Sequence, residues 1–151
     1  MRPILLVEDN QDDVLFFRRA MGKAEIIHPL HVASDGGEAI EYLDKFTKPS
    51  DSVDEFRPCL VLLDLQLPRV KGMEVLKWIR EQPPLRTLIV IIHTSSHLEA
   101  EIERAYQLGA NSFLVKAPCS DDLVRMLKLV KAYWLELNAS VTGDLRSSGD
   151  I

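Results

Sequence analysis

Residues 60–72 read LVLLDLQLPRVKG and join a short apolar run to a charged loop. The run at residues 60–63 shows no alternation of apolar and polar side chains, which is typical of a strand buried on both faces of a parallel sheet. Asp64 follows this run directly, and apolar residues return at helical spacing from Met73 until Pro83 bars the helix from continuing. The stretch therefore predicts a strand, a loop and a helix in that order.

The same unit recurs along the chain on both sides of this stretch. Stretches with helical spacing separate further apolar runs, which occupy residues 4–7, 30–33, 88–92 and 113–115. An alternation of strands and helices predicts a parallel sheet with helices on both faces. We therefore expect an α/β fold with five parallel strands and a last helix that runs from about residue 121 to residue 137.

The composition excludes several classes of protein. The 151 residues suit one domain, and 18 Lys and Arg against 23 Asp and Glu give a net charge of −5. Such a chain is a poor candidate for non-specific nucleic-acid binding, which depends on basic patches. Its two cysteines, Cys59 and Cys119, are too few for a disulfide framework. These cysteines fit a reducing cytosol, where thiols stay free, so we expect a cytoplasmic protein. No apolar run approaches the ~20 residues of a membrane span, so we expect no membrane segment.

We expect residues 1–137 to form the domain and residues 138–151 to form a flexible C-terminal tail. The tail contains glycine and serine and few apolar residues, and such segments cannot bury enough surface to fold by themselves. It is too short for a second domain, so we expect no DNA-binding domain.

Polar side chains stand where four of the predicted strands end. These side chains are Glu8 and Asp9 after the first strand, Asp64 after the third, Thr94 at the fourth and Lys116 after the fifth. In an open parallel sheet, ligands bind at the carboxyl ends of the strands. Neighbouring strands would bring these side chains to one rim, where crowded carboxylates repel one another unless a cation such as Mg²⁺ lies between them.

This combination of side chains suits phosphoryl transfer. An aspartate nucleophile forms an aspartyl phosphate, and Mg²⁺ neutralises the phosphoryl oxygens during the transfer. Lys116 supplies a point charge and Thr94 a hydroxyl donor for those oxygens. Taken singly, Glu8 and Asp9 also suit a helix cap, and Lys116 also suits a solvated surface. Their joint occurrence at the ends of separate strands favours a phosphoryl-transfer site over these separate structural roles.

The sequence resembles the receiver domain of two-component response regulators. The resemblance rests on ILLVEDNQDD (4–13), LVLLDLQLPRVKG (60–72), IIHTSS (91–96) and LGANSFLVK (108–116), and it spans residues 4 to about 137. It implies a flavodoxin-like, doubly wound (βα)5 fold whose five-stranded parallel sheet has the strand order 2-1-3-4-5.

The resemblance also implies a role for each residue at the rim. Asp64 matches the aspartate that accepts a phosphoryl group from a histidine kinase. Asp9 matches the direct Mg²⁺ ligand and Glu8 its acidic companion. Gln66 matches the position whose backbone carbonyl completes the metal site.

The remaining matches concern the phosphate and the switch. Lys116 matches the lysine that pairs with the phosphate, Thr94 the switch hydroxyl, and Phe113 the aromatic residue that rotates inward on activation. One position departs from the family, because Ala117 follows Lys116 where the family usually has proline after a cis peptide bond. Either this bond is cis before alanine, at a cost of about 2.5–4 kcal/mol, or the loop takes a different path before Pro118.

The last helix predicts a partner surface. One broad face at about 100° per residue holds Leu123, Met126, Leu127, Val130, Tyr133, Trp134 and Leu137, with Leu129 at its margin and Val124 outside it. This face is wider than intramolecular packing requires, which predicts a homodimer through the helix. The extended helix and the long loop at residues 47–58 resemble the small response regulators that partner bacterial phytochrome kinases.

The leading hypothesis is a signalling switch without enzymatic activity. A phosphohydrolase that forms an aspartyl phosphate commonly has a second acid two residues after the nucleophile, where this chain has Gln66. A degenerate receiver that acts as a binding module is the other alternative, and Ala117 is the feature that supports it.

Overall fold

The computed structural model describes residues 1–49 and 53–140. It contains a five-stranded parallel sheet in the order β2-β1-β3-β4-β5. The strands are β1 (Ile4–Val7), β2 (Leu30–Ala33), β3 (Leu60–Leu63), β4 (Val90–Thr94) and β5 (Ser112–Val115). The expected α/β fold and strand order are therefore confirmed, and each strand lies within two residues of its predicted bounds.

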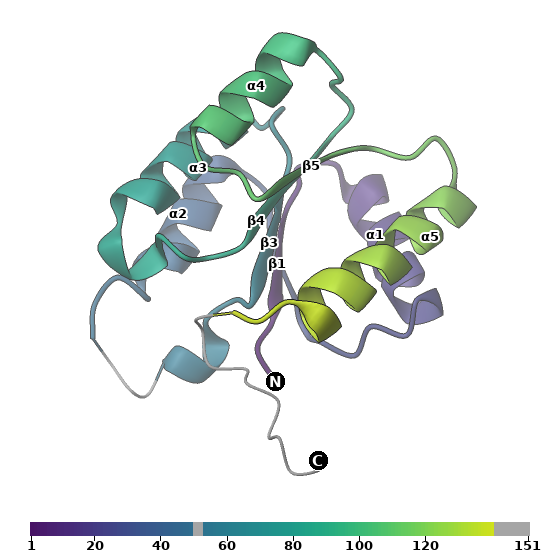
Figure 1. The fold of residues 1–151 in the computed structure, drawn as a ribbon, viewed down its shortest axis with the longest axis horizontal. Coiled ribbons are helices and arrows are strands. Elements are labelled where there is room, and N and C mark those ends of the chain that lie inside the picture. The colour runs from purple at the N-terminus through teal and green to yellow at the C-terminus, as the bar shows by residue number, and fades with distance from the viewer. Residues whose placement is uncertain (50–52, 141–151) are drawn as a thin grey trace.

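Helices cover both faces of the sheet (Figure 1). The helices are α1 (Gln11–Lys23), α2 (Gly36–Asp44), α3 (Gly72–Glu81), α4 (Glu99–Gln107) and α5 (Ser120–Val130). One face carries α1 and α5, and the other carries α2, α3 and α4. Short 3-10 turns at Asp54–Phe56 and Pro83–Leu85 precede β3 and β4.

The alternation of side chains along each strand divides the core in two. In β1, Leu5 and Val7 point toward α2 and α3, while Ile4 and Leu6 point toward α1 and α5. The strands β1, β3 and β4 are buried along their whole length. Burial of these side chains stabilises the fold by about 25 cal/mol per Å² of apolar surface. A shift of a strand by one residue would move each side chain to the opposite face of the sheet, so this packing fixes the register.

The last helix differs from the prediction in two respects. The α-helix ends at Val130, and the chain continues as a π-helical segment, Lys131–Leu137. Val124, which the periodicity left outside the apolar face, packs against the core between α5 and the sheet. α5 packs against both α1 and the sheet, so its buried arc is wide enough to include Val124. Tyr133 and Leu137 remain exposed.

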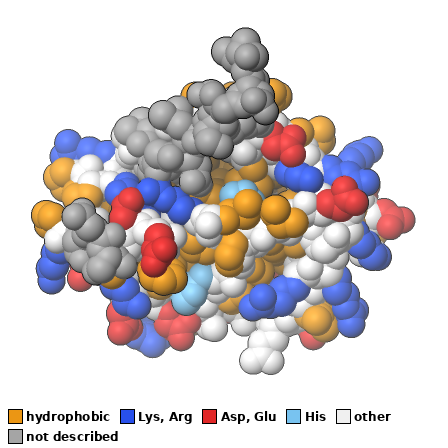
Figure 2. All heavy atoms as spheres, turned by 90° about the horizontal axis from the view of Figure 1, so that it is seen from below, with side chains coloured by type: hydrophobic (Ala, Val, Ile, Leu, Met, Phe, Trp, Pro, Cys, Tyr) orange, Lys and Arg blue, Asp and Glu red, His pale blue; other side chains and the backbone are white. Residues whose placement is uncertain are grey.

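The face opposite the rim, seen from below in Figure 2, carries no large patch of one charge sign among the described residues. Figure 2 shows apolar side chains near the middle of this face, with acidic and basic side chains interspersed around them. Within the described part of the chain, the structure contains no helix with the length and apolar character of a membrane span. Most of the predicted tail, residues 141–151, lies outside the described residues.

Candidate functional site

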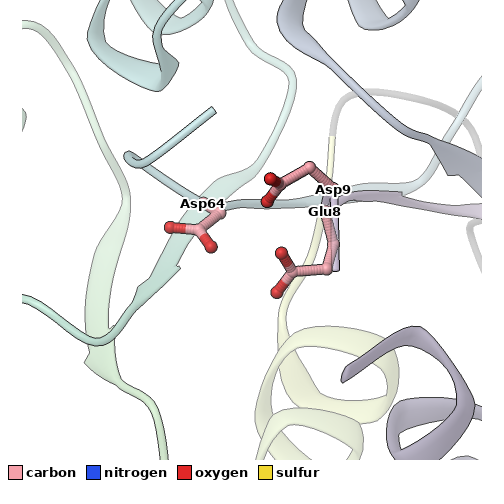
Figure 3. Close-up of side chains that lie close together, drawn as sticks. All are labelled: Glu8, Asp9 and Asp64. Atoms are coloured by element: carbon pink, nitrogen blue, oxygen red, sulfur yellow. The ribbon is translucent and has the colours of Figure 1, made fainter. Parts of the chain in front are cut away.

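Three carboxylates lie together at the carboxyl ends of β1 and β3. Val7 pairs with Leu63 in the sheet register, so the next residues, Glu8 and Asp64, leave the sheet side by side. Figure 3 shows the side chains of Glu8, Asp9 and Asp64 close together at this point. One oxygen of each carboxylate lies within 4.8 Å of the others. The structure therefore brings together the acids that the sequence analysis expected at one rim.

Burial changes the protonation of one of these acids. Glu8 is 4% exposed, and burial raises its pKa to about 7 although the nearby Lys116 ammonium opposes this rise. The neighbouring carboxylate of Asp64 raises the pKa further. Both increases in pKa reflect the cost of a negative charge on Glu8 in a buried site beside Asp64. A divalent cation with oxygen ligands would offset this negative charge. The donor set therefore fits a hard cation such as Mg²⁺.

The ammonium of Lys116 completes the cluster. It donates hydrogen bonds to Asp64 Oδ2 at 2.8 Å, to Glu8 Oε1 at 2.5 Å and to Asp13 Oδ2 at 3.0 Å. Burial by itself lowers the pKa of Lys116, but these hydrogen bonds outweigh burial and raise the pKa above its usual range. The lysine is therefore charged at neutral pH.

Residues 4–128 match the family model of the response regulator receiver domain. The chain belongs to the response regulator receiver family. This receiver is 35% identical over 133 residues to the response regulator Rcp1 of Synechocystis sp., which covers 88% of each chain. It is 36% identical over 137 residues to the probable methanogenesis regulatory protein FilR2 of Methanothrix harundinacea, which covers 91% of this chain and 86% of the relative.

Solved structures of relatives agree with the fold of this receiver. The phosphorylated cyanobacterial phytochrome response regulator RcpA superposes with a TM-score of 0.81 at 31% identity, over 92% of this chain and 97% of RcpA. The Mn²⁺-bound form of Rcp1 superposes with a TM-score of 0.80 at 33% identity, over 93% of this chain and 99% of Rcp1.

The loop that carries Lys116 in this receiver contains no cis peptide bond, since none occurs in the described residues. Of the two possibilities left open for the Lys116–Ala117 bond, the loop takes the trans path, and Pro118 follows. The backbone N–H of Lys116 donates to Thr94 O at 2.7 Å, which ties the lysine to the end of β4. The lysine thus reaches the acids without the Lys–Pro step of the family.

The two predicted switch residues lie on the neighbouring strands β4 and β5. Thr94 is completely buried, and its hydroxyl oxygen has no hydrogen-bond partner within residues 1–49 and 53–140. A buried hydroxyl without a hydrogen-bond partner lowers the stability of the protein by about 1–3 kcal/mol. The Thr94 hydroxyl would therefore gain stability by donating to an acceptor that enters the site. Phe113 is half-buried and packs against the core on the side of α2, α3 and α4.

The loop after β3 orients Asp64. The backbone N–H of Gln66 donates to Asp64 Oδ1 at 3.0 Å, and the Gln66 side-chain oxygen accepts a hydrogen bond from Ser95 Oγ at 3.3 Å. Gly72 lets the loop fold back, because a Cβ at this position would overlap the backbone of Asp64 and Leu65. Gln66, a predicted metal-site residue, therefore lies directly beside Asp64.

A cavity of about 410 Å³ adjoins the site between α1, α5 and the loop after β5. His93 forms part of its wall, and its ring packs at a tilt against Phe17 with 6.4 Å between the centroids. Burial lowers the pKa of His93 to about 4, with a smaller contribution from Lys116. The imidazole is therefore neutral at physiological pH.

Asp13 is the charged residue at this site that the sequence analysis missed. It lies in the first turn of α1, where its backbone N–H donates to the capping side chain of Asn10 at 3.0 Å. The available signal was the pair of acids at residues 12–13, but acids in a first helical turn are common because they complement the helix dipole. The contact with Lys116 depends on how α1 and the end of β5 are placed in space.

Proposed function

We propose that this receiver accepts a phosphoryl group on Asp64 from a histidine kinase in a Mg²⁺-dependent reaction. The observation that carries the proposal is the Lys116 ammonium at 2.8 Å from Asp64 Oδ2, beside three carboxylates suited to a divalent cation. The phosphorylated form of the relative RcpA supports the same chemistry for this chain.

In this proposal Glu8, Asp9 and Asp64 hold the cation, and the backbone carbonyl of Gln66 serves as a further ligand. The Mn²⁺-bound form of Rcp1 supports a divalent cation, and Mg²⁺ prefers the same oxygen ligands. When bound, the cation offsets the charge of the phosphoryl oxygens.

The side chains of the receiver carry the remaining steps. A carboxylate oxygen of Asp64 bonds to phosphorus while the bond from phosphorus to the kinase's histidine nitrogen breaks, and the imidazole keeps that electron pair. Lys116 pairs with one phosphoryl oxygen, and the Thr94 hydroxyl donates to another. The movement of Thr94 lets Phe113 rotate inward and changes the surface formed by α4, β5 and α5.

We also propose the kinds of partner. A phytochrome-type photoreceptor kinase is the proposed phosphodonor, because the relative RcpA is a phytochrome response regulator. A homodimer through the last helix is proposed because Leu129, Tyr133 and Leu137 are 66%, 53% and 76% exposed at a spacing of four residues. A two-fold contact would remove this apolar surface from water. Residues 1–137 are the proposed receiver unit.

The intact mass of the protein after incubation with acetyl phosphate and Mg²⁺ tests the phosphoryl proposal. We expect one phosphoryl group on the wild type and none on Asp64→Asn, which has nearly the same shape but no carboxylate. EDTA should abolish the addition to the wild type. Equal phosphoryl addition to the wild type and the variant would reject Asp64 as the acceptor, and no addition to the wild type would favour a binding module.

A further inference from the structure

All the hydrogen-bonding capacity of the Lys116 ammonium is in use. An ammonium has three N–H donors and accepts none, and here these donors meet Glu8, Asp13 and Asp64 at 2.5, 3.0 and 2.8 Å. A phosphoryl oxygen that is to pair with Lys116 must therefore displace one of these carboxylates.

The three carboxylates differ in how easily they can leave. The side chains of Glu8 and Asp64 are 4% and 5% exposed, and both belong to the group of acids whose oxygens lie within 4.8 Å. The side chain of Asp13 is 42% exposed, and it is not a member of that group. A buried carboxylate that leaves Lys116 is not rehydrated and depends on the cation alone for its charge, whereas an exposed one is rehydrated at little cost. Asp13 is therefore the partner that yields.

We propose that Asp13 is a positioning residue that restrains Lys116 in the unphosphorylated receiver and competes with the incoming phosphoryl group for its ammonium. The proposal rests on the proposed function of Asp64. Because the Asp13 carboxylate must be displaced before Lys116 can pair with phosphate, Asp13 slows the phosphorylation of this site. It acts through Lys116 and is not a member of the acidic group proposed to hold the cation.

The test compares Asp13→Asn with Asp12→Asn. Asparagine keeps the shape of the side chain but carries no negative charge, so the ion pair with the Lys116 ammonium is reduced to a hydrogen bond from the ammonium to an amide oxygen. Asp12 is exposed in the same helical turn, and no interaction with Lys116 involves it. Asp12→Asn therefore reproduces the change in net charge and in the helix dipole without releasing the lysine.

The measured quantity is the initial rate at which acetyl phosphate and Mg²⁺ phosphorylate each full-length protein, followed by intact mass. Asp64 oxygen bonds to phosphorus as acetate leaves with the electron pair of its bond to phosphorus. We expect Asp13→Asn to react about threefold faster than Asp12→Asn, because the variant loses a partly exposed ion pair of modest strength. Mg²⁺ affinity, measured by calorimetry, should be the same in both variants within about twofold, because Asp13 lies outside the acidic group.

A second salt concentration separates release of the lysine from weaker repulsion of the anionic donor. In 1 M NaCl the Debye length is about 3 Å, which screens long-range repulsion but not a direct contact. The rate ratio should persist there, and its disappearance would overturn the proposal. Equal rates of the two variants, or a slower Asp13→Asn, would also overturn it while leaving the function of Asp64 intact. A wild type that gains no phosphoryl group would instead reject the proposed function itself.

Discussion

The Lys116 ammonium lies 2.8 Å from a carboxylate oxygen of Asp64, although 52 residues separate the two in the chain. We expect Lys116→Ala to lower the rate of phosphorylation by acetyl phosphate roughly 10²-fold, because a preorganised donor to the transferring group is lost. Intact-mass kinetics measure this loss. Lys77→Ala, on the exposed side of α3, should retain the wild-type rate. A wild-type rate in Lys116→Ala would show that the lysine takes no part in the transfer.

The raised pKa of Glu8 predicts that cation binding releases protons. With a pKa of about 7, Glu8 is about half protonated at pH 7, and a cation ligand must be deprotonated. Mg²⁺ binding at pH 7 should therefore release about half a proton, and progressively less as the pH rises above 7. Calorimetry in two buffers of different ionisation enthalpy measures the release. Glu8→Gln should bind Mg²⁺ more weakly and release no proton, and an undiminished release would assign the proton to another group.

The lowered pKa of His93 predicts a loss of stability in acid. The folded protein keeps His93 neutral down to a pH of about 4, whereas the unfolded chain takes up this proton below about pH 6.5. The contribution of His93 is therefore present above pH 6.5 and is lost as the pH falls toward 4. At pH 4.5 the loss in the free energy of unfolding is roughly 2 kcal/mol.

Urea unfolding of the wild type and of His93→Leu at pH 7 and pH 4.5 isolates this effect. The variant should lose less stability on acidification by roughly 2 kcal/mol, since leucine takes up no proton. His97→Asn removes an exposed histidine and should behave like the wild type. If His93→Leu and the wild type lose equal stability, burial of His93 does not govern the acid response.

The close approach of Gly72 to the backbone of Asp64 predicts that a change in the loop after β3 will alter Mg²⁺ binding. Gly72→Ala forces a Cβ against the backbone of Asp64 and Leu65, which should cost about 1–3 kcal/mol and weaken Mg²⁺ binding. Thermal unfolding and calorimetry measure the two effects. Gly22→Ala is the matched control, since nothing lies within 4 Å of its added Cβ in α1 and alanine favours a helix. Unchanged Mg²⁺ affinity in a folded Gly72→Ala would separate the loop from the metal site.

The exposed apolar residues of the last helix predict a dimer. We expect sedimentation of the wild type to show a dimer and that of Tyr133→Glu to show a monomer, because a charge would be buried in the contact. Leu98→Glu, at a side chain that is 63% exposed beside α4, should remain dimeric. A monomeric wild type would contradict the dimer, and a dimeric Tyr133→Glu would move the contact elsewhere.

Local pattern alone predicted much of this receiver. The runs at residues 4–7 and 60–63 are observed strands, because continuous apolar runs mark strands buried on both faces. The edge strand at residues 30–33 also has its predicted bounds, although it contains the exposed His31 and is mostly only partly buried. Residues at the ends of such strands meet at one rim of a parallel sheet, so Asp64 and Lys116 were expected at the same rim from their positions in the chain. The strand order came from the resemblance to the family and not from periodicity.

Other features depended on contacts between elements that periodicity does not encode. The bond of Asp13 to Lys116 and the burial of His93 follow from the placement of α1 against the ends of β4 and β5. The exposure of Tyr133 follows from the packing of α5 against α1 and the sheet and from the π-helical segment after α5. A sequence pattern reports which face of an element is apolar, whereas the distance between two side chains is set by register and packing, which only the folded chain determines.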